Sequence, residues 1–408
     1  MGTTRKAMYV DLLLGILYAV FAALRDPVVI MRGRFWAEEG TLYFQDALSG
    51  RYYDALIKPR VGYYSLFNKL AALLASAVEL EWSAIVTAVC ALAAQTCVAF
   101  VILRSRLFPS IPAKACALAV LLLTMPGAEV ALNTINTQFF FAIGTAVILA
   151  SGENGGVPLW VRRAFLIVAG LTGPVSVMLF PFFLWRAWRE KSRFLAIEAG
   201  ILGGCAILQA VCMAAGLRSG VRGGHFDPLL ALASAVLNSL ILPWTDPEIA
   251  TSFALRLQTG AAGREAAVLA VLVASAAFTV LTVRIREAGW LMAASALLAS
   301  LCWLGATGAS WQTFAPFAGG RYSFAPNALI GLATVVVAGR ETHVWRRNAA
   351  LILLVIGLRN GAVDYLAHNF HGPDWQSEVK EWRRDPEKTW VALWPDPTWK
   401  LNLGRPRK

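Results

Sequence analysis

The residues best suited to chemistry are two adjacent carboxylates, Glu38 and Glu39, which directly follow the first apolar stretch of the chain. A basic turn with Lys58 and Arg60 comes after them. A carboxylate can act as a general base on a hydroxyl, and a guanidinium can bind two phosphate oxygens at once. The pattern therefore indicates chemistry on an anionic substrate. In the alternative interpretation, the glutamates stabilise a helix N-terminus and the basic pair anchors lipid headgroups.

Two other polar groups could contribute to a site. Arg321 and Tyr322 stand before a late apolar run, so they are candidates for a second phosphate contact or for an interfacial anchor pair. Arg222, His225 and Asp227 share one polar stretch and, with Tyr63 after the basic turn, are candidate secondary substrate contacts, although loop polarity explains the first three equally well. All six cysteines lie in apolar runs, so we expect neither disulfides nor a metal site. No cofactor is indicated, and the involvement of a divalent cation is left open.

Short helices are expected to position the acidic pair. A helix-like segment covers 42–48, and the basic turn follows it. Apolar residues then recur at three- and four-residue spacing from Tyr63 to Ala77, with Asn68 and Lys69 on the opposite face. This spacing is typical of a helix that lies in a membrane surface. The first outer loop, 25–82, would thus hold the catalytic acids against the lipid.

The composition places the chain in a membrane. Hydrophobic residues form 57% of the 408 residues, charged residues only 15%, and the mean hydropathy is +0.57. A water-soluble protein of this size could not bury so much apolar surface. We therefore predict an all-α polytopic membrane protein with about 11 transmembrane helices. A transmembrane domain would cover 1–363, and a small extracytoplasmic cap 364–408.

The apolar runs predict the individual spans, which are 8–24, 83–103, 115–125, 138–150, 164–185, 194–215, 266–283, 288–306, 323–339 and 349–363. Basic residues flank 164–185 on both sides, and Leu171–Pro174 interrupts it. We favour a hairpin of two half-helices there over one kinked span, because the hairpin keeps both basic patches inside. The stretch 229–244, within a long outer loop at 216–264, is either a surface helix or an additional span.

The charge distribution orients the chain. The predicted inner loops hold 16 basic and four acidic residues, a net charge of +12 that equals the excess of the whole protein. They are 1–7, 104–114, 151–163, 186–193, 284–287 and 340–348. Such a bias is a topology signal and excludes a nucleic-acid partner. We expect a multi-pass protein of the bacterial inner membrane, with a cytoplasmic N-terminus and an extracytoplasmic site and C-terminus.

The order of these features resembles the GT-C superfamily, membrane glycosyltransferases that use polyprenyl-phosphate-linked sugars, such as the protein mannosyltransferases and the lipid A aminoarabinose transferase. The resemblance covers about residues 8–190. It maps the catalytic carboxylate onto Glu38 or Glu39 and a second acid onto Glu129. The family's Lys-Pro-Pro-x-x-Tyr turn is similar to Lys58–Tyr63, which lacks the second proline, and its Leu-Thr-Lys-Gly-Pro motif is similar to Leu171–Pro174, which lacks the lysine.

The resemblance implies transfer of a sugar from a polyprenyl-phosphate donor to an envelope glycan, glycolipid or protein, with inversion at the anomeric carbon. Donor phosphate would bind Arg60, Lys58, Arg321 and Tyr322. The alternatives are a transporter or flippase, which usually carries ionisable groups at mid-membrane, and an O-antigen-type polymerase. The tail from Asp364 is predicted to form a helix at 374–384 and two short strands around a proline-rich turn. We expect it to dock on the outer loops, as a cap over the acceptor entrance.

Overall fold

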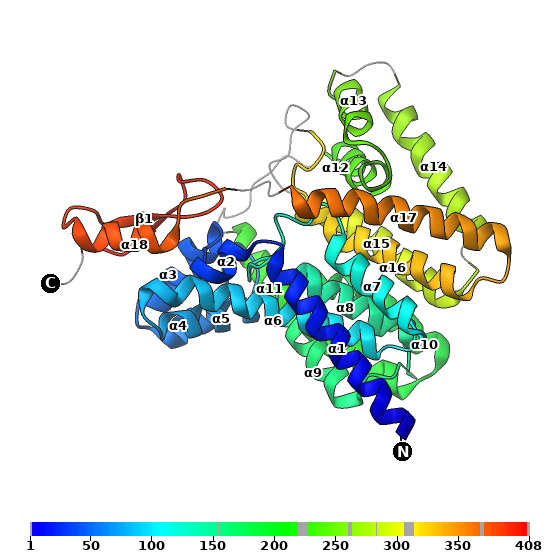
Figure 1. Ribbon diagram of the computed structural model, residues 1–408, viewed down its shortest axis with the longest axis horizontal. Helices are drawn as coiled ribbons and strands as arrows, with labels where there is room; N and C mark the ends of the chain where they lie inside the picture. The colour runs from blue at the N-terminus through cyan, green and yellow to red at the C-terminus, as the bar shows by residue number, and fades with distance from the viewer. Residues whose placement is uncertain are drawn as a thin grey trace.

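The chain is almost entirely helical in the computed structural model (Figure 1). The structure describes residues 2–153, 155–218, 227–259, 263–282, 284–305, 314–367 and 371–405. One small antiparallel sheet interrupts the helices within these ranges. It pairs β1 (Trp390–Ala392) with β2 (Lys400–Asn402), with Trp390 opposite Asn402.

Five of the described helices are long and apolar enough to cross a membrane. They are α6 (Leu80–Arg104), α11 (Arg193–Arg218), α15 (Arg286–Gly305), α16 (Arg321–Arg340) and α17 (Val344–Leu366). Shorter apolar helices accompany them, namely α1 (Gly2–Leu24), α7 (Ile111–Leu123), α8 (Thr137–Ser151) and the continuous helical stretch α12–η3–η4 (Pro228–Ala235, Val236–Ile241, Leu242–Trp244). An all-α membrane protein is therefore confirmed, whereas the count of about 11 spans is not.

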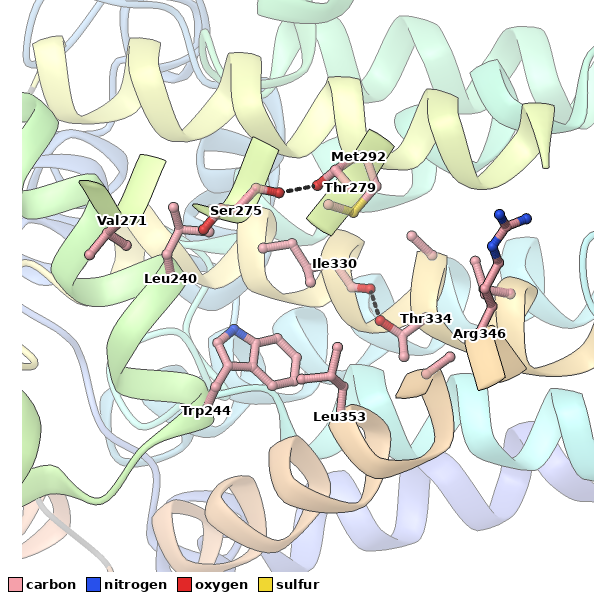
Figure 2. A pocket seen from close by; sticks show the side chains of 13 residues that line it. Leu240, Trp244, Val271, Ser275, Thr279, Met292, Ile330, Thr334, Arg346 and Leu353 are labelled. Atoms are coloured by element: carbon pink, nitrogen blue, oxygen red, sulfur yellow. Dashed lines mark hydrogen bonds between the residues drawn. The ribbon is translucent and has the colours of Figure 1, made fainter. Parts of the chain in front are cut away.

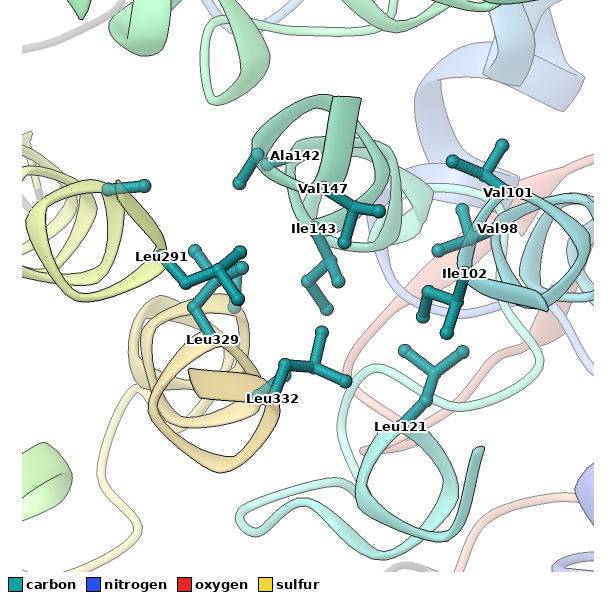
Figure 3. Close-up of a cluster of buried hydrophobic side chains, with 14 of the residues drawn as sticks. Val98, Val101, Ile102, Leu121, Ala142, Ile143, Val147, Leu291, Leu329 and Leu332 are labelled. Atoms are coloured by element: carbon teal, nitrogen blue, oxygen red, sulfur yellow. The ribbon is translucent and has the colours of Figure 1, made fainter. Parts of the chain in front are cut away.

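The core forms around α8. Every residue of this helix from Thr137 to Ala150 is buried, as expected for a helix that is apolar on all sides. Figure 3 shows Ile143 and Val147 of α8 facing side chains from α6, α7, α15 and α16, among them Leu121 and Leu332. The helices that flank α8 therefore come from both halves of the chain.

Five of the predicted inner loops meet at one end of the bundle. The Arg340 guanidinium donates to the carbonyls of Arg106 and Leu107, and the Arg106 amide donates to the carbonyl of Gly155. Arg286 pairs with Glu190. Further links are Arg340 to Glu287 and Ser192 to Glu153. We call this the basic end; it comprises 104–114, 151–163, 186–193, 284–287 and 340–348.

The stretch 164–185 turns back on itself. Helix α9 (Leu159–Leu171) ends at Thr172, and a 3₁₀ turn, η2 (Ser176–Leu179), leads into α10 (Phe180–Glu190). Arg162 near the start of α9 donates to the carbonyl of Gly152, and Arg186 near the end of α10 donates to that of Leu149. Both basic patches therefore lie at the C-terminal end of α8, in agreement with the hairpin.

The first outer loop folds into short helices, α2 (Pro27–Arg32), η1 (Glu39–Phe44), α3 (Gln45–Leu48), α4 (Tyr52–Ile57) and α5 (Leu66–Ser76). In α5 the leucines Leu70 and Leu74 are exposed, whereas Asn68 and Lys69 are buried. The polar face thus turns into the protein and the leucines turn away from it. This explains why the sequence shows an amphipathic pattern but does not show which face is buried.

The C-terminal segment packs on that first loop, where Figure 1 shows it at one side of the molecule. Its helix α18 (Trp375–Arg384) buries Trp375 edge-on to Phe35, with ring centroids 4.9 Å apart. The Trp394 amide donates to the carbonyl of Phe35 at 3.1 Å, and the Ala37 amide donates to that of Trp394 at 2.6 Å. The segment is therefore joined through backbone hydrogen bonds to the residues just before the acidic pair.

Two further helices, α13 (Pro247–Gln258) and α14 (Arg264–Thr282), complete the fold. They pack on η3, and Figure 1 shows them with α12 above α17, away from α1 and α9.

Candidate functional site

The site lies at the opposite end of α16 from the basic end. Arg321 begins this helix and Arg340 ends it, so the two arginines are about 30 Å apart at 1.5 Å per residue. The start of η1, the loop between α7 and α8, and the start of α16 meet there. We call this region the carboxylate end, after Glu38, Glu39 and Glu129.

Glu39 is a buried carboxylate with three donors. Its side chain accepts from the Trp36 amide at 3.0 Å, from the Thr134 amide at 2.8 Å and from the Thr134 hydroxyl at 2.5 Å. Burial raises the pKa of Glu39, while these hydrogen bonds and the Arg34 charge lower it. With only 1% of the residue exposed, Glu39 joins the first outer loop to the loop before α8.

Arg34 supports the same connection. It is buried between the rings of Trp36 and Trp394, 4.9 Å and 4.8 Å from their centroids, and donates to the carbonyl of Ala131 at 2.7 Å. Burial lowers the pKa of Arg34 to about 10, and the nearby Asp26 and Glu39 carboxylates oppose that shift. In the sequence only Trp36 lies near Arg34, and the stacking partner Trp394 is 360 positions away, so Arg34 was not among the predicted site residues.

Glu38 occupies a different environment from Glu39. It is half-buried, and no described residue donates a hydrogen bond to its carboxylate. Its charge acts on the guanidinium of Arg321 and on the hydroxyl of Tyr43. Glu38 is thus the member of the acidic pair that remains available to a ligand.

Arg321 brings the predicted second acid into the site. Its guanidinium forms an ion pair with Glu129, and its amide donates to the same carboxylate at 3.2 Å. The guanidinium also donates to the Tyr322 hydroxyl at 3.3 Å and lies 5.0 Å from the centre of that ring. About a third of the Arg321 side chain stays exposed. The structure therefore brings Glu38, Glu129, Arg321 and Tyr322 together from three separate segments.

Tyr43 and Lys69 lie between the acidic pair and the basic turn. The Tyr43 hydroxyl lies beside Asn68 and Tyr63, and burial raises its pKa well above 10. The Lys69 ammonium donates to the carbonyls of Ala55 and Lys58, both at 2.6 Å. Burial lowers the pKa of Lys69 to about 8. The sequence analysis noticed Lys69 only as part of the polar face of a surface helix.

Arg60 already has an anionic partner. Its guanidinium forms a two-pronged pair with Asp46, with Nε 2.6 Å from Oδ2. Arg60 and Tyr63 exchange backbone hydrogen bonds of 3.1 Å across the turn, where Val61 and Gly62 have φ of 53° and 77°. The Lys58 side chain is exposed. Of the two predicted phosphate ligands in this turn, Lys58 is thus the more accessible and Arg60 is the better fixed.

The two motifs that carry the family resemblance adjoin each other. The amide of Gly173 donates to the carbonyl of Tyr64 at 3.0 Å, and Ser65 pairs with Thr172. The Gln209 amide group bridges them, since it donates to the carbonyls of Tyr64 and Gly170. Gly173 has φ of +96°, and a Cβ there would lie 2.3 Å from Gln138 Oε1, so the turn requires glycine.

Of the remaining candidates, the structure describes only Asp227, which lies away from this group of residues. Arg222 and His225 lie outside the described residues. The Asp227 carboxylate caps α12, where it accepts from the Leu230 amide at 2.9 Å. Among the described residues, no group of histidine, cysteine, aspartate and glutamate side chains could hold a metal ion.

A pocket of about 640 Å³ opens beside the ion pair. Glu129 and Gly320 border it on one side, and Asp246, Glu248 and Arg359 on others. Its size lies within the range usual for small-molecule sites. The pocket carries more acidic than basic side chains, which suits a hydroxyl-bearing ligand better than a phosphate. Comparison of the chain with protein-family models, curated proteins and solved structures finds no match.

Proposed function

We propose that the protein is a glycosyltransferase that moves a sugar from a polyprenyl-phosphate donor to an extracytoplasmic hydroxyl of an envelope glycan, glycolipid or protein. The observation that carries this proposal is the meeting of Glu38, Glu129 and Arg321 at one end of an apolar helix bundle. A free carboxylate, a paired carboxylate and an accessible guanidinium are the groups that such a transfer needs at the membrane surface.

Glu38 acts as the general base in this proposal. The acceptor oxygen bonds to the sugar C1 as the bond from C1 to the phosphate oxygen breaks, and the acceptor proton passes to the Glu38 carboxylate. The bonding electrons leave with the lipid phosphate, and direct displacement inverts C1. Glu39 serves as a positioning residue, because its three hydrogen bonds occupy both carboxylate oxygens and fix the backbone next to Glu38.

Arg321 is the best candidate to receive the departing phosphate. Glu129 binds Nη1 of its guanidinium and Tyr322 binds Nη2, and the remaining N–H groups of the side chain, a third of which is exposed, can donate to a ligand. Lys58 adds a second cation from the basic turn, whereas Arg60 would first have to leave Asp46. Charge-assisted contacts to the phosphate would strengthen as the lipid phosphate becomes free.

The proposed topology follows from the two ends of the bundle. The basic end carries the arginines and lysines that favour the cytoplasmic side, so the carboxylate end faces outward. The helices α1, α7, α8 and α14 supply the crossings beyond the five long helices, and the hairpin α9–η2–α10 returns to the basic end. The bacterial inner membrane is the proposed location.

A transfer assay with a matched control tests the proposal. Purified protein in nanodiscs is incubated with polyprenyl phosphates carrying radiolabelled hexoses or pentoses and with an envelope extract as acceptor. We expect Glu38→Gln to lower transfer by about 100-fold or more, the usual contribution of a general base. Asp54→Asn, in the same outer loop but exposed and paired only with Arg51, should retain activity. Full transfer by Glu38→Gln would remove Glu38 as the base, and no transfer by the unmodified protein would remove the function.

A further inference from the structure

An apolar groove crosses the half of the bundle nearer the basic end (Figure 2). It encloses about 500 Å³, with walls from α14, α16 and α17 and from η3 and η4. Leu240, Trp244, Ile330 and Leu353 line it, and the hydroxyls of Thr279 and Thr334 are already bonded within their own helices, to the carbonyls of Ser275 at 2.7 Å and Ile330 at 2.8 Å. Apart from the Ser275 hydroxyl and Arg346, the walls of the groove therefore offer an apolar ligand only apolar surface.

The length of the groove matches one leaflet of a membrane. On α14 its lining runs from Val271 to Thr279, about 12 Å at 1.5 Å per residue. The hydrocarbon of one leaflet is about 15 Å thick, half of the usual core. An acyl chain lying along the helices would thus fit within the groove.

Arg346 stands at the end of this groove (Figure 2). Its side chain is only 9% exposed, yet its Nε and Nη1 atoms have no hydrogen-bond partner. The acidic group paired with it, Glu341, has its Oε2 atom 3.9 Å from Nη1, beyond hydrogen-bond distance, while the amides of Thr342 and His343 hold the other carboxylate oxygen. Stacking on Trp345 at 4.9 Å orients the guanidinium without satisfying its donors. Leaving such donors buried and unpaired is costly.

We propose that the groove binds one acyl chain of an anionic phospholipid, with the lipid phosphate on Arg346. An anionic lipid fits because an apolar channel of leaflet length ends at a buried guanidinium whose Nε and Nη1 donate no hydrogen bond, on the side where headgroups lie. A guanidinium can hold two oxygens of a phosphodiester, and basic pockets between membrane helices on the cytoplasmic side bind such headgroups. This site lies at the opposite end of α16 from Glu38 and does not depend on the proposed sugar transfer.

Native mass spectrometry of the full chain, released from detergent with added lipid, tests the site. The probes are phosphatidylglycerol and phosphatidylcholine with the same acyl chains. We expect one phosphatidylglycerol to remain bound, and Arg346→Gln to weaken its binding about tenfold, as the loss of a charge-assisted contact would. Arg347→Gln is the matched control, because Arg347 is adjacent, equally charged and exposed, and it should bind like the unmodified protein.

A second variant probes the acyl chain itself. Val271→Phe fills the groove at the end away from Arg346 (Figure 2), so it should weaken phosphatidylglycerol binding whether or not Arg346→Gln folds. Equal retention of phosphatidylcholine, or equal losses in Arg346→Gln and Arg347→Gln, would overturn the proposal. Displacement of phosphatidylglycerol by an equimolar polyprenyl phosphate would also overturn it, since the groove would then belong to the sugar carrier.

Discussion

Glu129 and Arg321, 192 positions apart in the sequence, form an ion pair between the loop before α8 and the first residue of α16. The Glu129 backbone carbonyl is itself held by the side-chain amides of Asn133 and Asn136, at 2.8 Å and 2.9 Å. The pair therefore rests on a loop that is already rigid. It fixes the end of the bundle at which Glu38 lies.

The Glu129–Arg321 pair should contribute to stability as well as to the site. We expect Glu129→Gln and Arg321→Met each to lower the free energy of unfolding by about 1 to 3 kcal/mol, because each leaves a partly buried charged or polar partner unsatisfied. The double variant should lose less than the sum of the two. Thermal unfolding in detergent measures all three, and strict additivity would show that the two side chains do not interact.

The buried Glu39 carboxylate should make stability depend on pH. Because burial raises its pKa above 4.5, the folded state holds the proton to higher pH than the unfolded state does. The contribution of Glu39 to the free energy of unfolding is therefore fully present below about pH 4.5, and it is lost as the pH rises through the raised pKa of the folded state. Melting temperatures measured upward from pH 4.5 should fall in the unmodified protein, and Glu39→Gln should remove this part of the slope.

Thr134→Val provides the complementary test for Glu39. Removing the hydroxyl donor takes away a hydrogen bond that lowers the pKa of Glu39. The loss of stability should then extend to higher pH than in the unmodified protein. If Glu39→Gln kept the original pH slope, the titrating group would lie elsewhere.

Sequence patterns revealed the helices and the ends of the bundle because both depend on local composition. Apolar runs gave α6, α11, α15, α16 and α17, and the basic loops that they separate do meet at one end. The break between α9 and α10 was predictable from a Gly-Pro step between two basic patches. These features depend on hydropathy, on backbone preferences and on charge, each of which is readable over a few residues.

The pairing of charged groups could not be predicted from the sequence. Arg60 was predicted to bind phosphate and forms an ion pair with Asp46, and Lys69 was predicted on the polar face of a surface helix and is buried. Glu38 and Glu39 are adjacent and chemically identical, and the burial of Glu39 against Trp36 and Thr134 separates their roles. Such distinctions arise when distant segments pack together, which no spacing along the chain encodes.

Arg34 should be irreplaceable by lysine. A lysine keeps the charge but loses the flat surface that stacks between Trp36 and Trp394. We expect Arg34→Lys to lower the free energy of unfolding by about 1 to 2 kcal/mol and to speed amide exchange in residues 371–405. Arg32→Lys is the control, since Arg32 is exposed and pairs with Asp374 at 3.1 Å. Equal exchange rates in both variants would show that stacking does not hold the C-terminal segment.

Gly361 allows α17 to approach α7. A Cβ at this position would lie 1.6 Å from the backbone oxygen of Leu123, so the two helices would have to separate. Gly361→Ala should therefore destabilise the protein by about 1 to 3 kcal/mol or more, as overpacking does. Gly204→Ala, in α11 with open space around it, should be neutral or slightly stabilising because alanine favours helix. Matching melting temperatures for the two variants would contradict this close approach.

Lys69 should hold the basic turn in place. Lys69→Met removes both hydrogen bonds to the carbonyls of Ala55 and Lys58, and we expect a loss of about 1 to 3 kcal/mol in the free energy of unfolding. In the unmodified protein, burial lowers the pKa of Lys69 to about 8 from 10.5. The folded state thus releases this proton at lower pH than the unfolded state does, and stability from this group should rise as the pH goes from about 8 to 10.5. Melting curves across that interval should show the rise in the unmodified protein and not in Lys69→Met; a rise that persists in the variant would assign it to another group.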